Sequence, residues 1–254
     1  ALPADLSLNN LQGGENLTLT GNGTISDKNV ATGKTLDVSG LTLGNGSGGT
    51  PGLSSNYKLD GGTHTFNVTK KDITFSGSRV YDGTTTVTSS DLVTNDTTSG
   101  ETLAFSGSGT VSSANVQNNQ SITLGSIAIA DGSGGGLASN YNLTTGTFDI
   151  SQKWVSVGGQ KVYDATTTVS SSDLEVTGEV TGESISITGT GSVTDKNVGS
   201  GKTIDISGLS LSDGSHSASN YTIGTTSFAI TPRNLSISGE TVSYTHLTLP
   251  TIRS

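Results

Sequence analysis

Three short motifs recur along this chain at intervals of 80 to 86 residues, and this repetition limits its possible folds more than any other feature. They are an Asn-Tyr pair, an Asn-Val pair and a Val-Tyr-Asp triplet. They stand at Asn56-Tyr57, Asn140-Tyr141 and Asn220-Tyr221; at Asn29-Val30, Asn115-Val116 and Asn197-Val198; and at Val80-Tyr81-Asp82 and Val162-Tyr163-Asp164. The chain is therefore predicted to consist of tandem copies of one small domain, each with its own core.

The order of the motifs predicts the domain boundaries. Residues 71–152 and 153–233 should be full repeats, and residues 1–70 the C-terminal part of an earlier one. Residues 234–240 begin a further repeat. The sequence contains no Met, so we expect it to be an internal piece of a longer protein.

Within each repeat the hydrophobic residues alternate with polar ones. Leu103 and Phe105 alternate in one copy, and Ile185 and Ile187 do so in the next. A period of two in a Thr-rich segment indicates half-buried antiparallel strands, and no amphipathic helix is evident. Roughly six such strands per repeat need two packed sheets to bury a core. We expect an all-β protein made of small antiparallel β-sandwich-like domains of about 80 residues, with short joints that favour a rod.

The alternation slips by one residue near the end of each repeat. Ile204 and Ile206 are followed out of phase by Leu209 and Leu211, with Gly208 at the slip. A β-bulge or a sharp bend would absorb the extra residue. The alternative is that one strand ends there and a turn begins.

Composition excludes several classes of function. The net charge of −9 argues against binding to nucleic acid or to anionic membranes. No run of 18 apolar residues is present, so we expect no membrane insertion. The absence of Cys is compatible with export in an unfolded state.

The repeated motifs resemble the YDG-type repeats of filamentous-haemagglutinin-like bacterial surface adhesins, many of them exported by two-partner secretion. The similarity covers about residues 15 to 239 and lies in three elements in the same order. They read Arg79-Val80-Tyr81-Asp82-Gly83-Thr84-Thr85-Thr86 and Lys161-Val162-Tyr163-Asp164-Ala165-Thr166-Thr167-Thr168; Asp27-Lys28-Asn29-Val30-Ala31-Thr32-Gly33-Lys34 and Asp195-Lys196-Asn197-Val198-Gly199-Ser200-Gly201-Lys202; and the Ser-Asn-Tyr triplets.

This resemblance implies a secreted or cell-surface location and an adhesive or stalk role. Its partners would be neighbouring repeats and host or biofilm surface glycans or proteins. The chain departs from the pattern at Ala165, which replaces Gly, so we expect that position not to need a positive φ. In the middle repeat Ser113-Ala114 replaces Asp-Lys, and Asn119-Gln120 replaces Gly-Lys.

No catalytic, cofactor-binding or metal-binding residues are predicted, and we expect no enzyme activity. The three His residues are scattered, with no metal or triad spacing. Asp82 and Asp164 are interpreted as turn residues that accept backbone N–H groups, with calcium binding as the alternative. Asp27 and Asp195 could also be ligands, but Ser113 in the matching position argues against a shared metal.

The remaining motif residues are interpreted as structural. Each Tyr of the Asn-Tyr pairs should pack at a strand end, with the preceding Asn capping a turn; stacking against a sugar is the alternative. We expect Trp154 to pack at a repeat joint, and the Asp131 and Asp213 segments to be flexible loops rather than calcium loops. These structural predictions cover Tyr81, Asp82, Tyr163, Asp164, Asn29, Asn115, Asn197, Asn56, Tyr57, Asn140, Tyr141, Asn220 and Tyr221.

Residues 241–254 break the repeat and resemble a translated sequencing adapter, so we predict a non-native tail. The sequence as a whole predicts a spacer and adhesion segment of a long secreted surface adhesin. The alternative function is a carbohydrate- or mucin-binding module, which should show exposed aromatic side chains in a groove.

Overall fold

The computed structural model describes residues 1–59 and 63–240, and it is all-β. The chain forms two compact units, Ala1–Ser151 and Gln152–Ser254. The helices of the described part are 3-10 turns of three residues each: η1 (Pro3–Asp5), η2 (Ser54–Asn56), η3 (Ser89–Asp91), η4 (Ala138–Asn140), η5 (Ser171–Asp173) and η6 (Ala218–Asn220). None of them is long and apolar enough to cross a membrane.

The last repeat, residues 153–233, contains eight strands, more than the six expected, and all its residues are described. One sheet has the order β15-β13-β20-β17 and the other the order β14-β16-β18, with β19 also paired to β16. The strands are β13 (Lys153–Val162), β14 (Thr168–Ser170), β15 (Leu174–Thr177), β16 (Ile185–Val193), β17 (Gly199–Lys202), β18 (Ile204–Asp205), β19 (Leu209–Asp213) and β20 (Tyr221–Thr231).

The middle repeat, residues 71–152, has matching strands in the same order. Its largest sheet runs β10-β12-β5-β7, and β8 pairs with β11 and β6 with β9. The strands are β5 (Lys71–Val80), β6 (Thr86–Thr88), β7 (Leu92–Thr94), β8 (Leu103–Ser106), β9 (Ser108–Thr110), β10 (Gln117–Ser121), β11 (Ala128–Asp131) and β12 (Tyr141–Ser151).

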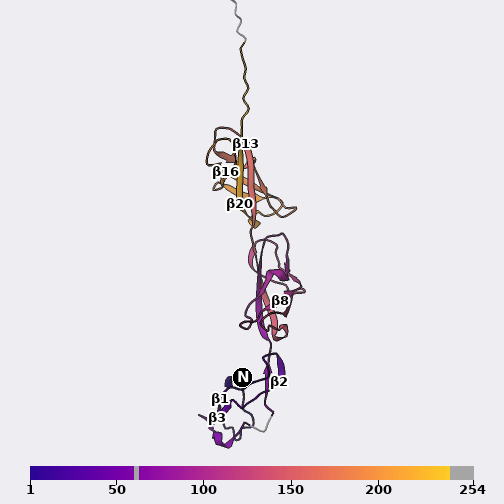
Figure 1. The fold of residues 1–254 in the computed structure, drawn as a ribbon, viewed down its shortest axis with the longest axis vertical. Helices are drawn as coiled ribbons and strands as arrows, with labels where there is room; N and C mark the ends of the chain where they lie inside the picture. The colour runs from indigo at the N-terminus through magenta and orange to yellow at the C-terminus, as the bar shows by residue number, and fades with distance from the viewer. Residues whose placement is uncertain (60–62, 241–254) are drawn as a thin grey trace, which may run out of the picture. The chain divides into compact units, whose positions relative to one another are not determined.

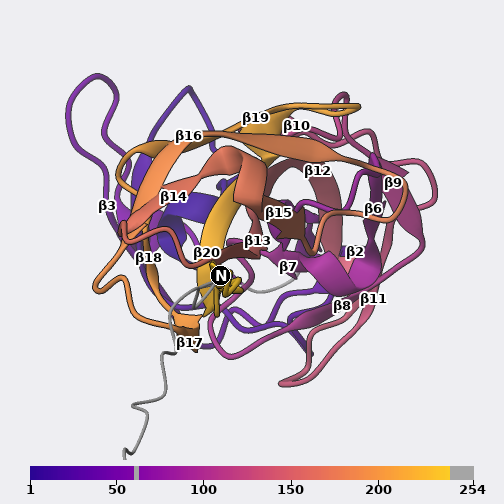
Figure 2. The same ribbon diagram turned by 90° about the horizontal axis from the view of Figure 1, so that it is seen from above.

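The first and last strands of each repeat pair in parallel, although the alternation predicted antiparallel strands throughout. β13 lies beside β20 in both views, with Lys153 opposite Tyr221 and Val162 opposite Thr231 (Figures 1 and 2). β5 and β12 pair in the same way. The chain therefore enters a repeat at one end of this strand pair and leaves it at the other end.

The core lies between the sheets and follows the predicted alternation. In the last repeat it includes Val157, Val169, Phe228 and Ile230, all at most 2% exposed. Phe75, Phe148 and Ile150 are the corresponding residues of the middle repeat, again almost fully buried. Burial of these side chains is the main stabilising contribution that such a thin core can make.

The slip in the alternation is a turn and not a β-bulge. The backbone N–H of Leu209 donates to the carbonyl of Ile206, which closes a four-residue turn through Ser207 and Gly208. The first and middle repeats close the same turn, through Leu41 and Ile127. After the turn the next strand begins a new alternation with its own inward-facing residues, so no β-bulge is needed.

Residues 1–70 hold the later elements of a repeat. They form η1, η2, β1 (Leu17–Gly21), β2 (Ala31–Thr35), β3 (Leu41–Asn45) and β4 (Thr65–Val68). β4 corresponds to β12 and β20, but its only partner strand among the described residues is β2. The prediction about residues 241–254 lies outside the described part of the chain.

Candidate functional site

The Tyr-Asp motif of the last repeat forms a tight reversal between β13 and β14. Oδ1 of Asp164 accepts hydrogen bonds from the backbone N–H of Thr166 at 2.9 Å and from its hydroxyl at 2.9 Å. Nζ of Lys161 lies 3.0 Å from the same carboxylate oxygen. The Thr166 backbone bond, followed by Lys161, lowers the pKa of Asp164 to about 2. The carboxylate therefore orders the turn, as the sequence predicted.

The middle repeat builds the same reversal with other residues. Asp82 accepts from the backbone N–H of Thr84 at 3.0 Å, and Nη2 of Arg79 lies 3.3 Å from the carboxylate. The guanidinium also donates to the carbonyls of Thr84 and Thr86. A buried cation three residues before the Asp is thus part of the motif, although sequence reasoning gave it no role.

One prediction about this turn is wrong. Ala165 has a φ of 67°, close to the 77° of Gly83 in the other copy. The hydrogen bonds of Asp164 hold the backbone in the left-handed region, and they outweigh the preference of an alanine to avoid it. The Gly-to-Ala replacement therefore changes the strain at this position but not its conformation.

The Asp-Lys-Asn motif forms a second turn. Asp195 accepts from the backbone N–H of Asn197 at 2.9 Å and from Nζ of Lys202 at 2.8 Å. Lys202, the first cause, and the Asn197 bond hold the pKa of Asp195 below its ordinary value. In the first repeat the same pattern joins Asp27 to Asn29 and Lys34, and it lowers the pKa of Asp27.

The middle repeat keeps this turn without any charge. The hydroxyl of Ser113 accepts the backbone N–H of Asn115 at 3.1 Å. Gln120, which takes the place of the Lys, accepts the N–H of Ser113 at 3.0 Å. The acid and the base have therefore been replaced together, and the turn is preserved by hydrogen bonds between neutral groups.

The Tyr of each Asn-Tyr pair begins or precedes the last strand, and its hydroxyl donates to a glutamate. Tyr141 and Tyr221 are almost fully buried. Their partners are Glu101 at 2.5 Å and Glu183 at 2.5 Å. Tyr57 donates to Glu15 at 2.7 Å in the first repeat. Sequence reasoning missed these glutamates, which stand 38 to 42 residues before the Tyr.

The side chain of Asn140 does not cap its own turn, contrary to the prediction. In the middle repeat the side chain of Asn140 reaches the first repeat. Its Oδ1 accepts the backbone N–H of Val30 at 2.9 Å, and its Nδ2 donates to Asn29 at 3.0 Å. Lys28 pairs beside them with Glu101. Asn29 and Asn140, predicted separately, therefore meet at the joint between two repeats.

Acidic loops supply the turn cap instead. Asp131 accepts the backbone N–H of Ala138 at 2.8 Å, and Asp213 accepts that of Ala218 at 2.7 Å. These loops are thus joined by hydrogen bonds to η4 and η6. Within the described residues no three or more His, Cys, Asp or Glu side chains lie close enough to hold a metal ion.

The aromatic side chains give a mixed picture. Phe75, Phe148 and Phe228 are buried in the cores, as are three of the repeated Tyr residues: Tyr81, Tyr141 and Tyr221. Trp154 is 75% exposed and lies against Gly224 of its own repeat. Among the residues that the structure describes, one exposed ring on a strand surface does not form the aromatic groove expected of a sugar-binding module.

These features define a protein built from tandem all-β repeats, in which the repeated polar residues order turns. A family model described as the YDG domain matches residues 63–148 and 152–228. The chain therefore belongs to the YDG domain family. No curated protein and no solved structure matched the chain.

Proposed function

We propose that this chain is a structural spacer and adhesion segment of a long secreted bacterial surface adhesin, and that it is not an enzyme. The observation that carries the proposal is the parallel pairing of the first and last strands of a repeat. β13 and β20 lie side by side over ten residue pairs. The first joins Lys153 to Tyr221 and the last joins Val162 to Thr231. A repeat with this arrangement has its entry and exit at opposite ends.

Such a repeat suits a stalk that is held under tension. Force applied through the two ends acts along β13 and β20 in opposite directions, so it loads all the hydrogen bonds between them at once. The joints are short: a single residue, Gln152, separates β12 from β13. Little chain is left there for a flexible linker.

The use of the repeated polar groups also supports a structural role. Asp82, Asp164 and Asp195 accept hydrogen bonds from their own turns, and the Tyr hydroxyls donate to glutamates of their own repeats. The side chains that recur between copies therefore serve the fold. In this proposal, neighbouring repeats are the first partners of each domain, and host or biofilm surface glycans or proteins are contacted by the adhesin as a whole.

Single-molecule pulling on the full chain tests the proposal. We expect two separate high-force unfolding events, one for each full repeat, each releasing about 80 residues at about 3.4 Å per residue. Unfolding at forces no higher than those of a helical control protein would contradict a load-bearing role.

A glycan array tests the alternative function, a carbohydrate- or mucin-binding module, with the same chain. We expect the parent chain to give no more signal than the Trp154→Ala variant. This variant is the comparison because Trp154 is the exposed aromatic residue best placed for stacking on a sugar. Specific binding that is lost in this variant would overturn the spacer proposal in favour of a carbohydrate-binding module.

A further inference from the structure

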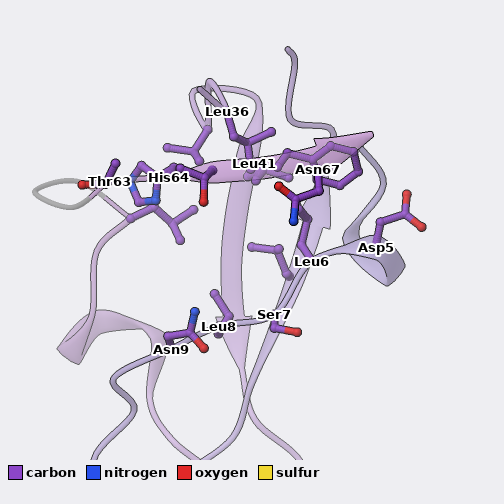
Figure 3. A pocket seen from close by; sticks show the side chains of 15 residues that line it. Asp5, Leu6, Ser7, Leu8, Asn9, Leu36, Leu41, Thr63, His64 and Asn67 are labelled. Atoms are coloured by element: carbon purple, nitrogen blue, oxygen red, sulfur yellow. The ribbon is translucent and has the colours of Figure 1, made fainter. Parts of the chain in front are cut away.

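Two pockets lie along β4, and they differ in which repeats line them. A pocket of 550 Å³ is lined by Phe66, Asn67 and other residues of the first repeat (Figure 3). A smaller pocket of 180 Å³ is lined by Val68 and by further residues of both the first and the middle repeat. The second pocket therefore lies at the joint between these two repeats, and its residues show how one repeat contacts the next.

A buried carboxylate stands at this joint. The side chain of Glu101, in the middle repeat, is only 4% exposed, and its Oε2 accepts the hydroxyl of Tyr141 at 2.5 Å. Its Oε1 pairs with Nζ of Lys28, which belongs to the first repeat. Burial favours the neutral acid, but Lys28, the first cause, and Tyr141 hold the pKa of Glu101 below its ordinary value. The counter-charge of a buried group in one repeat is thus supplied by the repeat before it.

Two hydrogen bonds beside the ion pair fix the position of the joint. Asn140 accepts the backbone N–H of Val30 at 2.9 Å and donates to Oδ1 of Asn29 at 3.0 Å. Lys28, Asn29 and Val30 are consecutive residues of the Asp-Lys-Asn turn. Asp27 orders this turn by accepting the backbone N–H of Asn29 at 2.8 Å. The turn therefore presents three successive residues to the following repeat in one fixed arrangement.

The lysine of this turn varies between copies, and the variation is matched in the repeat that follows. The middle repeat has Ala114 at the position of Lys28. The last repeat has a histidine beside its own glutamate: Nε2 of His216 lies 3.8 Å from Oε1 of Glu183, the counterpart of Glu101. The loss of a lysine in one repeat thus coincides with a group in the next that can carry a positive charge. This is expected if a buried carboxylate needs a cation beside it.

We propose that the Asp-Lys-Asn turn is a docking surface for the following repeat, and that the residue at the position of Lys28 selects the partner. The partner is a repeat of the same family with a buried glutamate at the position of Glu101 and no cation of its own beside it. Lys28 neutralises this glutamate across the joint, so the middle repeat is more stable when docked on the first. The inference goes beyond the proposed function, because it applies to any protein that carries these repeats in tandem.

Hydrogen exchange of the full chain, measured by mass spectrometry, tests the proposal. Lys28→Ala changes a side chain of the first repeat that is 60% exposed, yet the amides of β5 and β12 in the middle repeat should exchange about fivefold faster or more. Exchange in β13 and β20 of the last repeat should stay the same. Lys28→Arg keeps the charge, and Lys196→Ala changes the same motif position of the last repeat, so both controls should leave β5 and β12 as in the parent chain. Unchanged exchange of β5 and β12 in Lys28→Ala would overturn the proposal.

A double-mutant cycle separates the counter-charge from other effects of the lysine. Glu101→Gln removes the buried charge and keeps an oxygen that can accept the hydroxyl of Tyr141. In this background Lys28→Ala should accelerate exchange of β5 and β12 far less, because no charge is left for the lysine to neutralise. An equal effect of Lys28→Ala in both backgrounds would overturn the role of Lys28 as the counter-ion of Glu101.

Limited trypsin digestion measures the opening of the joint itself, since Lys70 stands between β4 and β5. Cleavage after Lys70 should be several-fold faster in Lys28→Ala than in the parent chain or in Lys28→Arg, because the joint opens more often without the ion pair. Equal cleavage rates in the three chains would contradict a docked joint. Faster cleavage of Lys28→Ala with unchanged exchange in the middle repeat would show that the lysine only tethers the joint, and it would overturn the stabilising role proposed for it.

Discussion

Nζ of Lys161 lies 3.0 Å from Oδ1 of Asp164, and the lysine side chain is only 7% exposed. The same ammonium donates to the carbonyls of Thr166 at 3.1 Å and Thr168 at 2.5 Å. Lys161 of β13 thus places its charge beneath the following turn and bonds to residues on both sides of the chain reversal. The pair explains why this motif tolerates either lysine or arginine before the Asp.

Replacing Asp164 tests this account of the turn. Asp164→Ala removes the acceptor for the Thr166 N–H and leaves the buried Lys161 without its counter-charge, so the melting temperature of the last repeat should fall. Asp164→Asn keeps an acceptor oxygen, so this variant should lower the melting temperature less. Thermal unfolding followed by circular dichroism measures both variants. The ranking of the melting temperatures should be the same in excess calcium and in chelator. Destabilisation of the parent chain by chelator alone would instead make Asp164 a calcium ligand.

The lowered pKa of Asp164 predicts how stability depends on pH. The folded-state pKa is about 2 and the ordinary value is 3.8. A depressed pKa contributes stability that is fully present above the ordinary value and is lost as the pH falls through the folded value. The unfolding midpoint of the parent chain should therefore drop between about pH 4 and pH 2. The Asp164→Asn variant, which shares every other carboxyl group, should lose less over this window. Parallel curves would contradict the assignment.

Ala165 offers a way to stabilise the last repeat. Its φ of 67° is costly for alanine and free of strain for glycine. Ala165→Gly should raise the free energy of unfolding by about 0.5–1 kcal/mol, the relief of strain exceeding the added entropy of the unfolded chain. Chemical denaturation measures the change, and Gly83→Ala in the middle repeat should give a loss of similar size. No change in either variant would show that the turn holds no strain.

The fold class and the buried residues were predictable because a period of two specifies which side chains face inward. Ile185 and Ile187, which the alternation placed on one face, are both buried. Alternation does not specify which strand lies beside which, or in what direction. The parallel pairing of β13 with β20 joins segments about 70 residues apart, so it was beyond local pattern reasoning.

The candidate site was predicted in part, for similar reasons. Asp82 and Asp164 were assigned to turns correctly because their hydrogen-bond partners are two residues away. The partner of Tyr141, Glu101, is 40 residues distant, and the partner of Asn140 lies in another repeat. The recurrence of a Glu before the Tyr in all three copies was the available signal.

The close approach of β13 to the turn before β15 gives a last prediction. A Cβ added at Gly159 would overlap the backbone oxygen of Asp173, which cannot move without breaking the pairing of Gly159 with Leu174. Gly159→Ala should therefore destabilise the last repeat by about 1–3 kcal/mol, the range for overpacking a fixed site. Gly199→Ala is the control, since its Cβ would lie in ordinary van der Waals contact with Lys202, 3.4 Å from Cε, and it should change stability by less than about 0.5 kcal/mol. Urea denaturation measures both variants. Equal stabilities would show that the backbone at Gly159 yields easily and would contradict this prediction.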